Sequence, residues 1–261
     1  MAHILITGGN GYIATSVRNA LKDTHTITTI SRTDFDLSDP LQTRAWFGNK
    51  FFDVVIHTAI AGGSRLRTDA TEVLDTNLKM YYNLLDNRGN FGRFINIGSG
   101  AELFQKDTPY GLSKHIIRTS LLEKPDFYNL RVFAVFDENE LNSRFIKNNI
   151  VNHIRGHNMI IHQNKYMDFF YMKDFCSVVN HYISAVEPPK EYDCSYERTL
   201  SLVDIAEHIN TLGKNKVDIS IIAPGVENRY SADYPRVSLP LNFIGLTVGI
   251  TNVYNTLLCR K

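Results

Sequence analysis

The chain opens with a strand, a glycine turn and a helix in immediate succession. His3–Thr7 is an apolar, β-rich run, and a helical pattern ending at Leu21 follows the turn. Gly8 permits backbone conformations closed to other residues, and Gly11 lets the chain approach a pyrophosphate. Free N–H groups at the helix start then bind phosphate. We therefore predict a dinucleotide-binding βα unit rather than a simple tight turn, with cofactor contacts from Gly8, Asn10, Gly11, Tyr12 and Ile13.

The same alternation of strand and helix continues through the first half of the chain. Short apolar runs alternate with helical patterns, and the connections between them are brief. Repeated alternation of this kind is typical of an α/β fold with a doubly wound parallel sheet of the Rossmann type. The predicted strands are 26–30, 52–57, 94–97 and 129–136, the predicted helices are 41–47, 70–86 and 110–122, and the predicted dinucleotide-binding domain is 1–136.

The end of the second strand indicates which cofactor is bound. An acid there would bond a ribose 2′-hydroxyl, whereas an arginine suits a 2′-phosphate. The sequence has Ser31-Arg32 and no acid until Asp34. This favours NADP(H), with NAD(H) as the alternative, although Arg32 could also be an ordinary surface cation. Asp36 and Leu37 begin a segment predicted to touch the adenine.

Small residues follow the third strand. Thr58, Ala59 and Ile60 would let a cofactor lie against the strand end. His57 is predicted to be a packed strand-end histidine, because its neighbours are apolar and no cysteine or carboxylate stands at metal-ligand spacing. Asn77 lies on the apolar stripe of the helix 70–86, where a buried amide needs partners. We predict that it bridges active-site backbone and water.

Tyr110 and Lys114 are the predicted catalytic pair. A spacing of four places both on one helix face. A phenol has a pKa near ~10, and an adjacent ammonium lowers it by favouring the phenolate. Ser99, at the end of the preceding strand, could hold a substrate oxygen beside that phenol. In isolation such a pair is most often a solvated helix face, so the interpretation depends on the surrounding fold.

The pattern changes after Phe136. Helical patterns at 144–155, 173–185, 202–212 and 245–258 are interleaved with predicted strands at 159–162, 166–172 and 217–222. We interpret 137–261 mainly as a small substrate-binding cap, interleaved with the last elements of the first domain. Such a cap would cover the carboxyl edge of the sheet, where ligands bind in these folds.

Bulk composition excludes several classes of protein. The net charge is +1 over 261 residues, so no basic field for nucleic acid or an anionic membrane is expected. Three unclustered cysteines indicate neither a disulfide framework nor a metal site, and they fit a reducing compartment. No apolar run approaches ~18–20 residues, and no cleavable leader is recognisable. A cytoplasmic location, no metal and no membrane contact are therefore predicted.

The motifs in order resemble the extended short-chain dehydrogenase/reductases of the NAD-dependent epimerase/dehydratase family, especially GDP-fucose synthase-like and 4-keto-sugar reductase-like enzymes. The resemblance covers essentially the whole chain. It implies that Tyr110 is the general acid/base, that Lys114 also holds the nicotinamide ribose, and that a homodimer forms through two pairs of helices. The matching segments are TGGNGYIA (7–14), DL (36–37), HTAIAGG (57–63), Asn77, YGLSK (110–114), LRVFAVF (130–136) and KYMDFFYMKDF (165–175).

The chain also departs from this family. Many members carry the catalytic hydroxyl where Gly100 stands, one residue after Ser99, and the link from Gly100 to Tyr110 is short. Ala134 and Met167 replace an asparagine and an arginine that many members use near the sugar nucleotide. Remodelled substrate contacts are therefore expected from Phe133, Asn142, Arg144 and Lys165, of which the last three could equally be surface residues.

The leading prediction is an NADP(H)-dependent oxidoreductase that reduces a 4-keto-6-deoxy nucleotide sugar. The first alternative is a redox-neutral nucleotide-sugar epimerase with retained cofactor. A dehydratase is weaker, because only Glu102 lies near the hydroxyl. A non-catalytic cofactor-binding protein is the third hypothesis, and Gly100 is the feature that keeps it open.

Overall fold

The computed structural model describes residues 1–64, 67–226 and 228–260. The chain divides into two compact units. The first comprises Met1–Val132 and Cys176–Asp193, and the second comprises Phe133–Phe175 and Cys194–Lys261. The chain therefore leaves the first unit near Val132, returns to it at Cys176 and leaves it again after Asp193.

A six-stranded sheet forms the centre of the first unit, as predicted for a doubly wound α/β fold. Its strand order is β2-β1-β3-β4-β5-β9, and the four pairs from β2 to β5 are all parallel. The order reverses between β1 and β3, so the loops after these two strands diverge to opposite sides. The strands are β1 (His3–Thr7), β2 (Thr26–Ile30), β3 (Phe52–His57), β4 (Phe91–Ser99), β5 (Phe127–Val132) and β9 (Glu191–Cys194).

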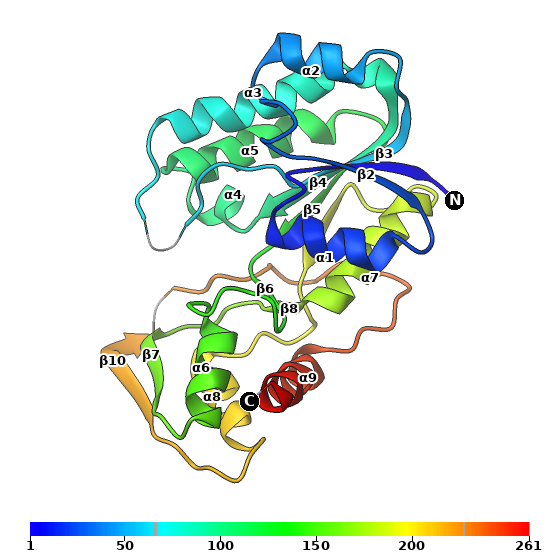
Figure 1. Cartoon of the computed structure of the whole chain (residues 1–261). Helices are drawn as coiled ribbons and strands as arrows, with labels where there is room; N and C mark the ends of the chain where they lie inside the picture. Colours follow the sequence, from blue (N-terminus) through cyan, green and yellow to red (C-terminus); the bar gives the residue numbers. More distant parts are fainter. Residues whose placement is uncertain (65–66, 227, 261) are drawn as a thin grey trace. The chain divides into compact units, whose positions relative to one another are not determined.

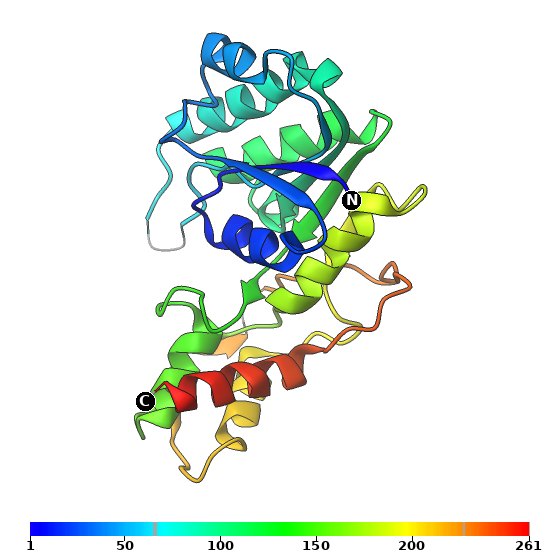
Figure 2. The ribbon, with the colours of Figure 1, turned by 45° about the vertical axis from the view of Figure 1, so that its right-hand side comes forward.

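Helices cover both faces of this sheet. Figures 1 and 2 show α2, α3 and α5 over one face, and α1 with α7 over the other. Apolar side chains of the strands and helices meet between the layers, where the Phe94 and Phe127 rings stack with centroids 4.9 Å apart. The helices are α1 (Tyr12–Leu21), α2 (Pro40–Phe47), α3 (Glu72–Asp86), η1 (Arg88–Asn90), α4 (Ala101–Phe104), α5 (Pro109–Leu122) and α7 (Met172–Ser184).

The second unit contains three helices and two small sheets. The helices α6, α8 and α9 pack on one another, and the strand pairs β7–β10 and β6–β8 are both parallel. Buried apolar side chains from all three helices form its core, with Phe136, Met167 and Tyr171 among them. The elements are β6 (Val135–Phe136), α6 (Phe145–Ile154), β7 (Met159–Asn164), β8 (Phe170–Tyr171), α8 (Leu202–Asn210), β10 (Ile219–Val226) and α9 (Leu246–Cys259).

Two strand predictions were wrong in extent. The run 129–136 forms β5 and then β6, which belong to different sheets. The aromatic run 166–172 contains only the two-residue strand β8. Met167 and Phe169 are instead buried in the core of the second unit, so core packing, rather than a strand ladder, explains the apolar residues there.

Three elements were not predicted: η1, β9 and α4. The last two bear on the site. β9 was missed because its sequence, EYDC, is only four residues long and its place in the sheet depends on a distant partner strand. α4 occupies part of the segment that was expected to be a loop between Gly100 and Tyr110. Both elements carry residues that prove important at the site described next.

Candidate active site

The ends of β1 and β3 are tied together by one hydroxyl group. Thr7 Oγ1 accepts the backbone N–H groups of Thr58 (3.2 Å) and Ala59 (3.1 Å), and Thr58 Oγ1 donates to the Thr7 carbonyl at 2.6 Å. These bonds fix the loop after β3 against the end of β1. They hold two predicted cofactor residues at the point where the strand order reverses, and Ile60 follows them in the same loop.

His57 is a packed strand-end histidine, as predicted. Its Nδ1 lies 2.8 Å from Thr7 Oγ1 and its side chain is buried. Both lone pairs of that hydroxyl accept N–H groups, so its hydrogen points to Nδ1, which must be unprotonated. Burial, helped by the nearby Lys114 charge, lowers the pKa of His57 to about 3. The imidazole is therefore neutral across the physiological range.

The glycine turn after β1 has the geometry of a phosphate cradle. Gly8 has a φ of 69°, and a Cβ there would lie 2.8 Å from the Ala59 Cα atom. The Gly11 N–H donates to the Gly8 carbonyl at 2.8 Å, and Gly11 caps α1 without a side-chain cap or an acid in the first turn. The first N–H groups of α1, from Tyr12 and Ile13 onward, are thus directed at an open helix end that favours anions. This region fits a dinucleotide pyrophosphate.

The end of β2 presents an exposed cation. Asp34 closes a turn by accepting the N–H and hydroxyl of Ser31 at 2.8 and 3.0 Å. Arg32 is exposed, with no hydrogen bond or ion pair within the described part of the chain. The acid nearest this strand end is therefore occupied, while the guanidinium is available to a 2′-phosphate.

The predicted adenine contacts, Asp36 and Leu37, both have local structural partners. The Asp36 carboxylate accepts the N–H and hydroxyl of Ser38. Leu37 is buried, and its carbonyl accepts a hydrogen bond from Asn83 of α3 at 2.9 Å. These contacts fix the segment between β2 and α2 on α3.

Asn77 bridges two parts of the site. Its side chain accepts the Ala61 N–H (2.8 Å) and donates to the Ala61 carbonyl (3.1 Å) and to Ser113 Oγ (3.0 Å). Ser113 in turn donates to the Tyr110 carbonyl at 2.7 Å. The buried amide thus joins the loop after β3 to the first turn of α5. The predicted contact with active-site backbone is present, and the second partner is Ser113.

Tyr110 lies in the first turn of α5 and packs on a glycine of the loop after β3. A Cβ at Gly63, which has a φ of 74°, would lie 2.7 Å from Cε2 of the Tyr110 ring. Gly63 is anchored by Asp69, which accepts its N–H at 3.0 Å. Glycine at this position is therefore required by the tyrosine ring as well as by the backbone angle.

Lys114 is buried one turn beyond Tyr110. Its Nζ donates to the Ile97 carbonyl of β4 at 2.5 Å. Burial lowers the pKa of Lys114 to about 8, and the negative charge of Glu102 opposes that decrease. The ammonium form therefore predominates at pH 7, as a positive charge inside the first unit.

Ser99 ends β4 at a corner that Gly100 turns. Ser99 Oγ accepts the Ala101 N–H at 3.2 Å, and the Gly100 N–H donates to the Val132 carbonyl at 2.9 Å. The accepted bond uses one lone pair, so the Ser99 hydroxyl keeps its own hydrogen and a second lone pair. Ser99 can therefore contact a substrate oxygen, whereas Gly100 brings no hydroxyl.

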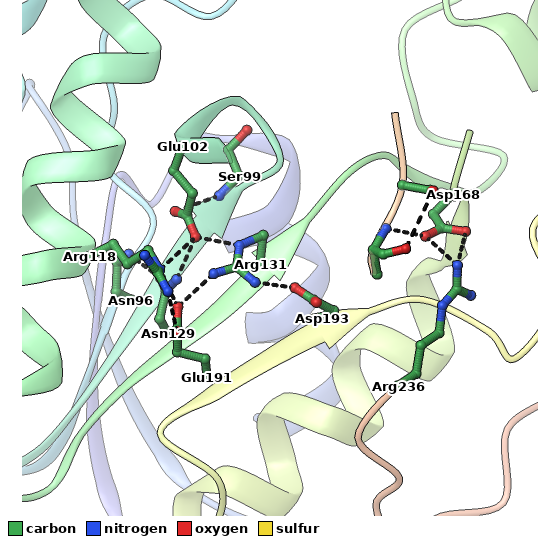
Figure 3. A network of polar contacts seen from close by, with 12 residues as sticks. Asn96, Ser99, Glu102, Arg118, Asn129, Arg131, Asp168, Glu191, Asp193 and Arg236 are labelled. Atoms are coloured by element: carbon green, nitrogen blue, oxygen red, sulfur yellow. Dashed lines mark hydrogen bonds and ion pairs between the residues drawn. The ribbon is translucent and has the colours of Figure 1, made fainter. Parts of the chain in front are cut away.

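A buried network behind this corner was not foreseen. Figure 3 shows Glu102 and Arg131 at its centre. Glu102 Oε1 accepts Arg131 Nε at 2.6 Å and Asn129 Nδ2 at 2.8 Å, and its Oε2 accepts the Ser99 N–H at 3.3 Å. Arg131 also pairs with Glu191 and Asp193 of β9. A usable signal existed in β5, where Asn129 and Arg131 share one face of an otherwise apolar strand.

The predicted substrate residues all lie in the second unit, on three segments. Phe133 is buried and packs edge-to-face on Tyr230, at 5.7 Å between centroids. Asn142 and Arg144 are exposed just before α6, and Lys165 follows β7. Met167 is buried in the apolar core.

The second unit also contains two arginines that the sequence did not single out. Arg229 and Arg236 lie over the Tyr234 ring, 5.0 and 4.7 Å from its centroid. Arg236 pairs with Asp168 at 2.9 Å (Figure 3).

Within the described ranges, no cluster of three or more His, Cys, Asp or Glu side chains could hold a metal ion. None of the described helices is both long and apolar enough to span a membrane.

Residues 4–195 match the NAD dependent epimerase/dehydratase family, and the chain belongs to that family. Its fold is similar to that of the GDP-mannoheptose C4 reductase MlghC from Campylobacter jejuni, solved with NADP (TM-score 0.79, 12% identity, 98% of both chains). It is also similar to a GDP-L-fucose synthetase from Naegleria fowleri bound to NADP (TM-score 0.75, 13% identity, 99% of this chain and 93% of that one). A third similar structure is UDP-N-acetylglucosamine 4-epimerase from Bacillus cereus (TM-score 0.73, 19% identity, 98% and 96%). No curated protein sequence matches the chain significantly.

Proposed function

We propose that this protein is an NADP(H)-dependent oxidoreductase that reduces the 4-keto group of a nucleotide-activated 6-deoxy sugar. The observation that carries the proposal is the Tyr110–Lys114 pair on α5, with Lys114 buried and bonded to the carbonyl of Ile97. Family membership and the solved reductases of similar fold support this reaction class.

In this proposal Tyr110 donates the proton that the reduced carbonyl oxygen requires. The Lys114 ammonium, one helical turn away, stabilises the phenolate that remains. The Ser99 hydroxyl donates a hydrogen bond to the same substrate oxygen and holds it near the phenol. Because burial sets the pKa of Lys114 at about 8, turnover should fall as the pH rises past that value.

The nicotinamide cofactor, when bound, supplies the hydride. The residues present fit it, since Gly8 and Gly11 leave room for a pyrophosphate at the start of α1. Arg32 would bind the 2′-phosphate, and the loop from Thr58 to Ile60 would line the nicotinamide side. Remaining cofactor contacts in this proposal are Asn10, Tyr12, Ile13, Asp36, Leu37, Asn77 and Lys114.

Glu102 argues against the dehydratase alternative. Its side chain is fully buried and both of its oxygens accept hydrogen bonds from protein groups. A carboxylate held in this way does not serve as a proton donor or acceptor for a substrate. Epimerisation with a retained cofactor remains the competing reaction, and the experiment below separates it from reduction.

The decisive experiment is a panel of 4-keto nucleotide sugars carrying GDP, UDP, dTDP or CDP, assayed with NADPH and NADH at the nicotinamide absorbance. We expect stoichiometric NADPH consumption with one nucleotide. Tyr110→Phe should lose at least ~100-fold in kcat, the size of a general acid contribution, while binding NADPH normally. Tyr82→Phe, at an exposed position on α3, is the matched control. Full activity of Tyr110→Phe, or turnover without NADPH consumption, would overturn the proposal.

We place the sugar nucleotide on the second unit, with Phe133, Asn142, Arg144 and Lys165 as the contacts. We also propose a cytoplasmic homodimer formed by α3 and α5, which pack side by side. Within the described part of the chain, Cys176, Cys194 and Cys259 form no disulfide, which suits a reducing compartment. Light scattering of the purified protein checks the dimer, and cell fractionation checks the location.

A further inference from the structure

The buried carboxylate of Glu102 has no part in the mechanism proposed above, yet it is bonded to the site. Its Oε2 accepts the N–H of Ser99, at the end of β4. Lys114 Nζ donates to the carbonyl of Ile97, two residues earlier on the same strand. Two buried groups of opposite charge therefore bind the same short stretch of β4, one from α4 and the other from α5.

The network around Glu102 balances charge only if Lys114 is included. The ion-paired side chains comprise two cations, Arg118 and Arg131, and three carboxylates, Glu102, Glu191 and Asp193. The cluster alone therefore carries one excess negative charge, and the Lys114 ammonium makes three cations against three anions. A buried charge without a counter-charge is costly, so this balance stabilises the protonated lysine.

We propose that Glu102 is a positioning residue that provides the buried counter-charge of Lys114 and holds the Ser99 corner in place. The inference rests on the proposed function, in which Lys114 must be an ammonium and Ser99 must face the substrate. Glu102 acts only through these two residues, because its side chain is fully buried. It is a positioning residue and contacts neither substrate nor cofactor.

Burial shifts the pKa values of two other ionisable groups near Lys114 out of the range in which it titrates. His57 of β3 has a pKa lowered by burial to about 3, and burial raises the pKa of Tyr81 of α3 to about 12. Arg118 of α5 and Arg131 of β5 stay charged. Burial raises the pKa of Glu102 itself, whereas the Arg131 charge and the hydrogen bonds from Arg131, Ser99 and Asn129 lower it and favour the carboxylate. In that form Glu102 opposes the loss of the Lys114 proton.

Glu102→Gln separates charge from geometry. The amide oxygen still accepts one of the N–H groups, but the negative charge is gone. We expect the titration of Lys114, followed by its Cε resonance in ¹³C-lysine-labelled protein, to move down by at least about half a pH unit. The resonance is assigned by its loss in Lys114→Met. The pH at which kcat declines on the alkaline side should move down by the same amount. The KM for NADPH should change less.

Three further variants keep the inference testable if Glu102→Gln does not fold. Arg131→Gln removes the cation that shares Glu102 and should move the Lys114 titration upward. Glu191→Gln removes one charge from the same network, at a carboxylate bonded to Arg118 and Arg131. It should move the Lys114 titration by less than about a third of the shift caused by Glu102→Gln. Glu102→Asp keeps the charge and should keep the titration near its original position.

An unshifted Lys114 titration in folded Glu102→Gln, or equal shifts in Glu102→Gln and Glu191→Gln, would overturn the inference. A lower melting temperature with an unshifted titration would assign Glu102 a purely structural role. The resonance is independent of turnover. A shifted titration in a protein that reduces no nucleotide sugar would therefore leave this inference standing and reject the proposed function instead.

Discussion

Two buried arginines, one in each unit, are bonded in different ways (Figure 3). In the first unit, Arg131 uses Nε, Nη1 and Nη2 on three different carboxylates. In the second unit, Arg236 uses only Nη2, on Asp168 and Thr199. Its Nε and Nη1 are buried without a hydrogen-bond partner in the described part of the chain. The first cluster is redundant, whereas the second depends on a single acid.

The number of carboxylates bound to an arginine determines how much stability is lost when one of them is removed. Removing one carboxylate from Arg131 leaves it two others. Removing Asp168 leaves the Arg236 guanidinium buried with no anion, and an uncompensated buried charge is among the most destabilising changes in a protein. The two units should therefore respond unequally to the same substitution.

The largest expected loss of stability is that of Asp168→Ala. It should lower the free energy of unfolding by about 3–5 kcal/mol, because it breaks a buried pair and also removes the acceptor of the Ala232 N–H. Glu191→Ala leaves Arg131 with Glu102 and Asp193 and removes the hydrogen bonds of Arg118, which is partly exposed, so it should cost only about 1 kcal/mol. Urea unfolding followed by circular dichroism measures both. Equal losses would show that the two clusters do not differ in the way their bonds suggest.

The second prediction compares backbone contact with side-chain contact. A Cβ at Gly111, next to Tyr110, would lie 1.9 Å from the Gln105 carbonyl oxygen, whereas a Cβ at Gly249 of α9 would meet the Tyr171 ring at 2.8 Å. A backbone carbonyl can shift less than a side-chain ring to relieve a clash. Gly111→Ala should therefore lower the free energy of unfolding by ~3 kcal/mol and Gly249→Ala by ~1 kcal/mol.

Gly89 is the matched control for these substitutions. A Cβ there meets nothing within 4 Å, so Gly89→Ala should be neutral or slightly stabilising. Thermal unfolding of the three variants tests the order. If Gly111→Ala leaves the melting temperature unchanged, the first turn of α5 must be able to shift.

The last prediction concerns pH and lies in the second unit. Burial raises the pKa of Glu140 from its ordinary value to about 8. The folded state therefore holds a proton that the unfolded state releases, and stability falls as pH rises from about 4.5 to 8. Glu140→Gln removes this dependence. Relative to the original protein it should be unchanged at pH 4 and more stable by about 4–5 kcal/mol at pH 8, because each unit of pKa difference between the folded and unfolded states is worth ~1.4 kcal/mol.

Melting temperatures of the Glu140→Gln pair across pH 4–8 check the prediction, because pH effects of the other groups cancel in the difference. A difference that stays constant with pH would place the Glu140 proton outside the folding equilibrium. Burial also raises the pKa of Glu102 in the first unit, but there the Arg131 charge and hydrogen bonds from Arg131, Ser99 and Asn129 oppose the rise.

Local sequence patterns were enough to predict the sheet and helix layers of the first unit and many residues of the candidate active site. The glycine turn, the strands up to β4 and the Tyr110–Lys114 spacing depend on short-range rules of sterics and periodicity. The Glu102–Arg131 network depends on pairing between segments 29 residues apart, and its other carboxylates come from β9, a further 60 positions along. No local rule links these residues. β8 and β9 were misjudged for the same reason, because their pairing is decided by distant partners.

The return of the chain to the first unit has a consequence for how the protein must be made. β9 is the last strand of the main sheet and is supplied by residues beyond 190, after a long excursion through the second unit. A fragment ending at residue 136 would leave β5 as an open edge and strip Arg131 of two of its three acids. On the ribosome, the nucleotide-binding sheet therefore cannot close until about three quarters of the polypeptide has emerged. Folding of the first unit must wait for synthesis of much of the second.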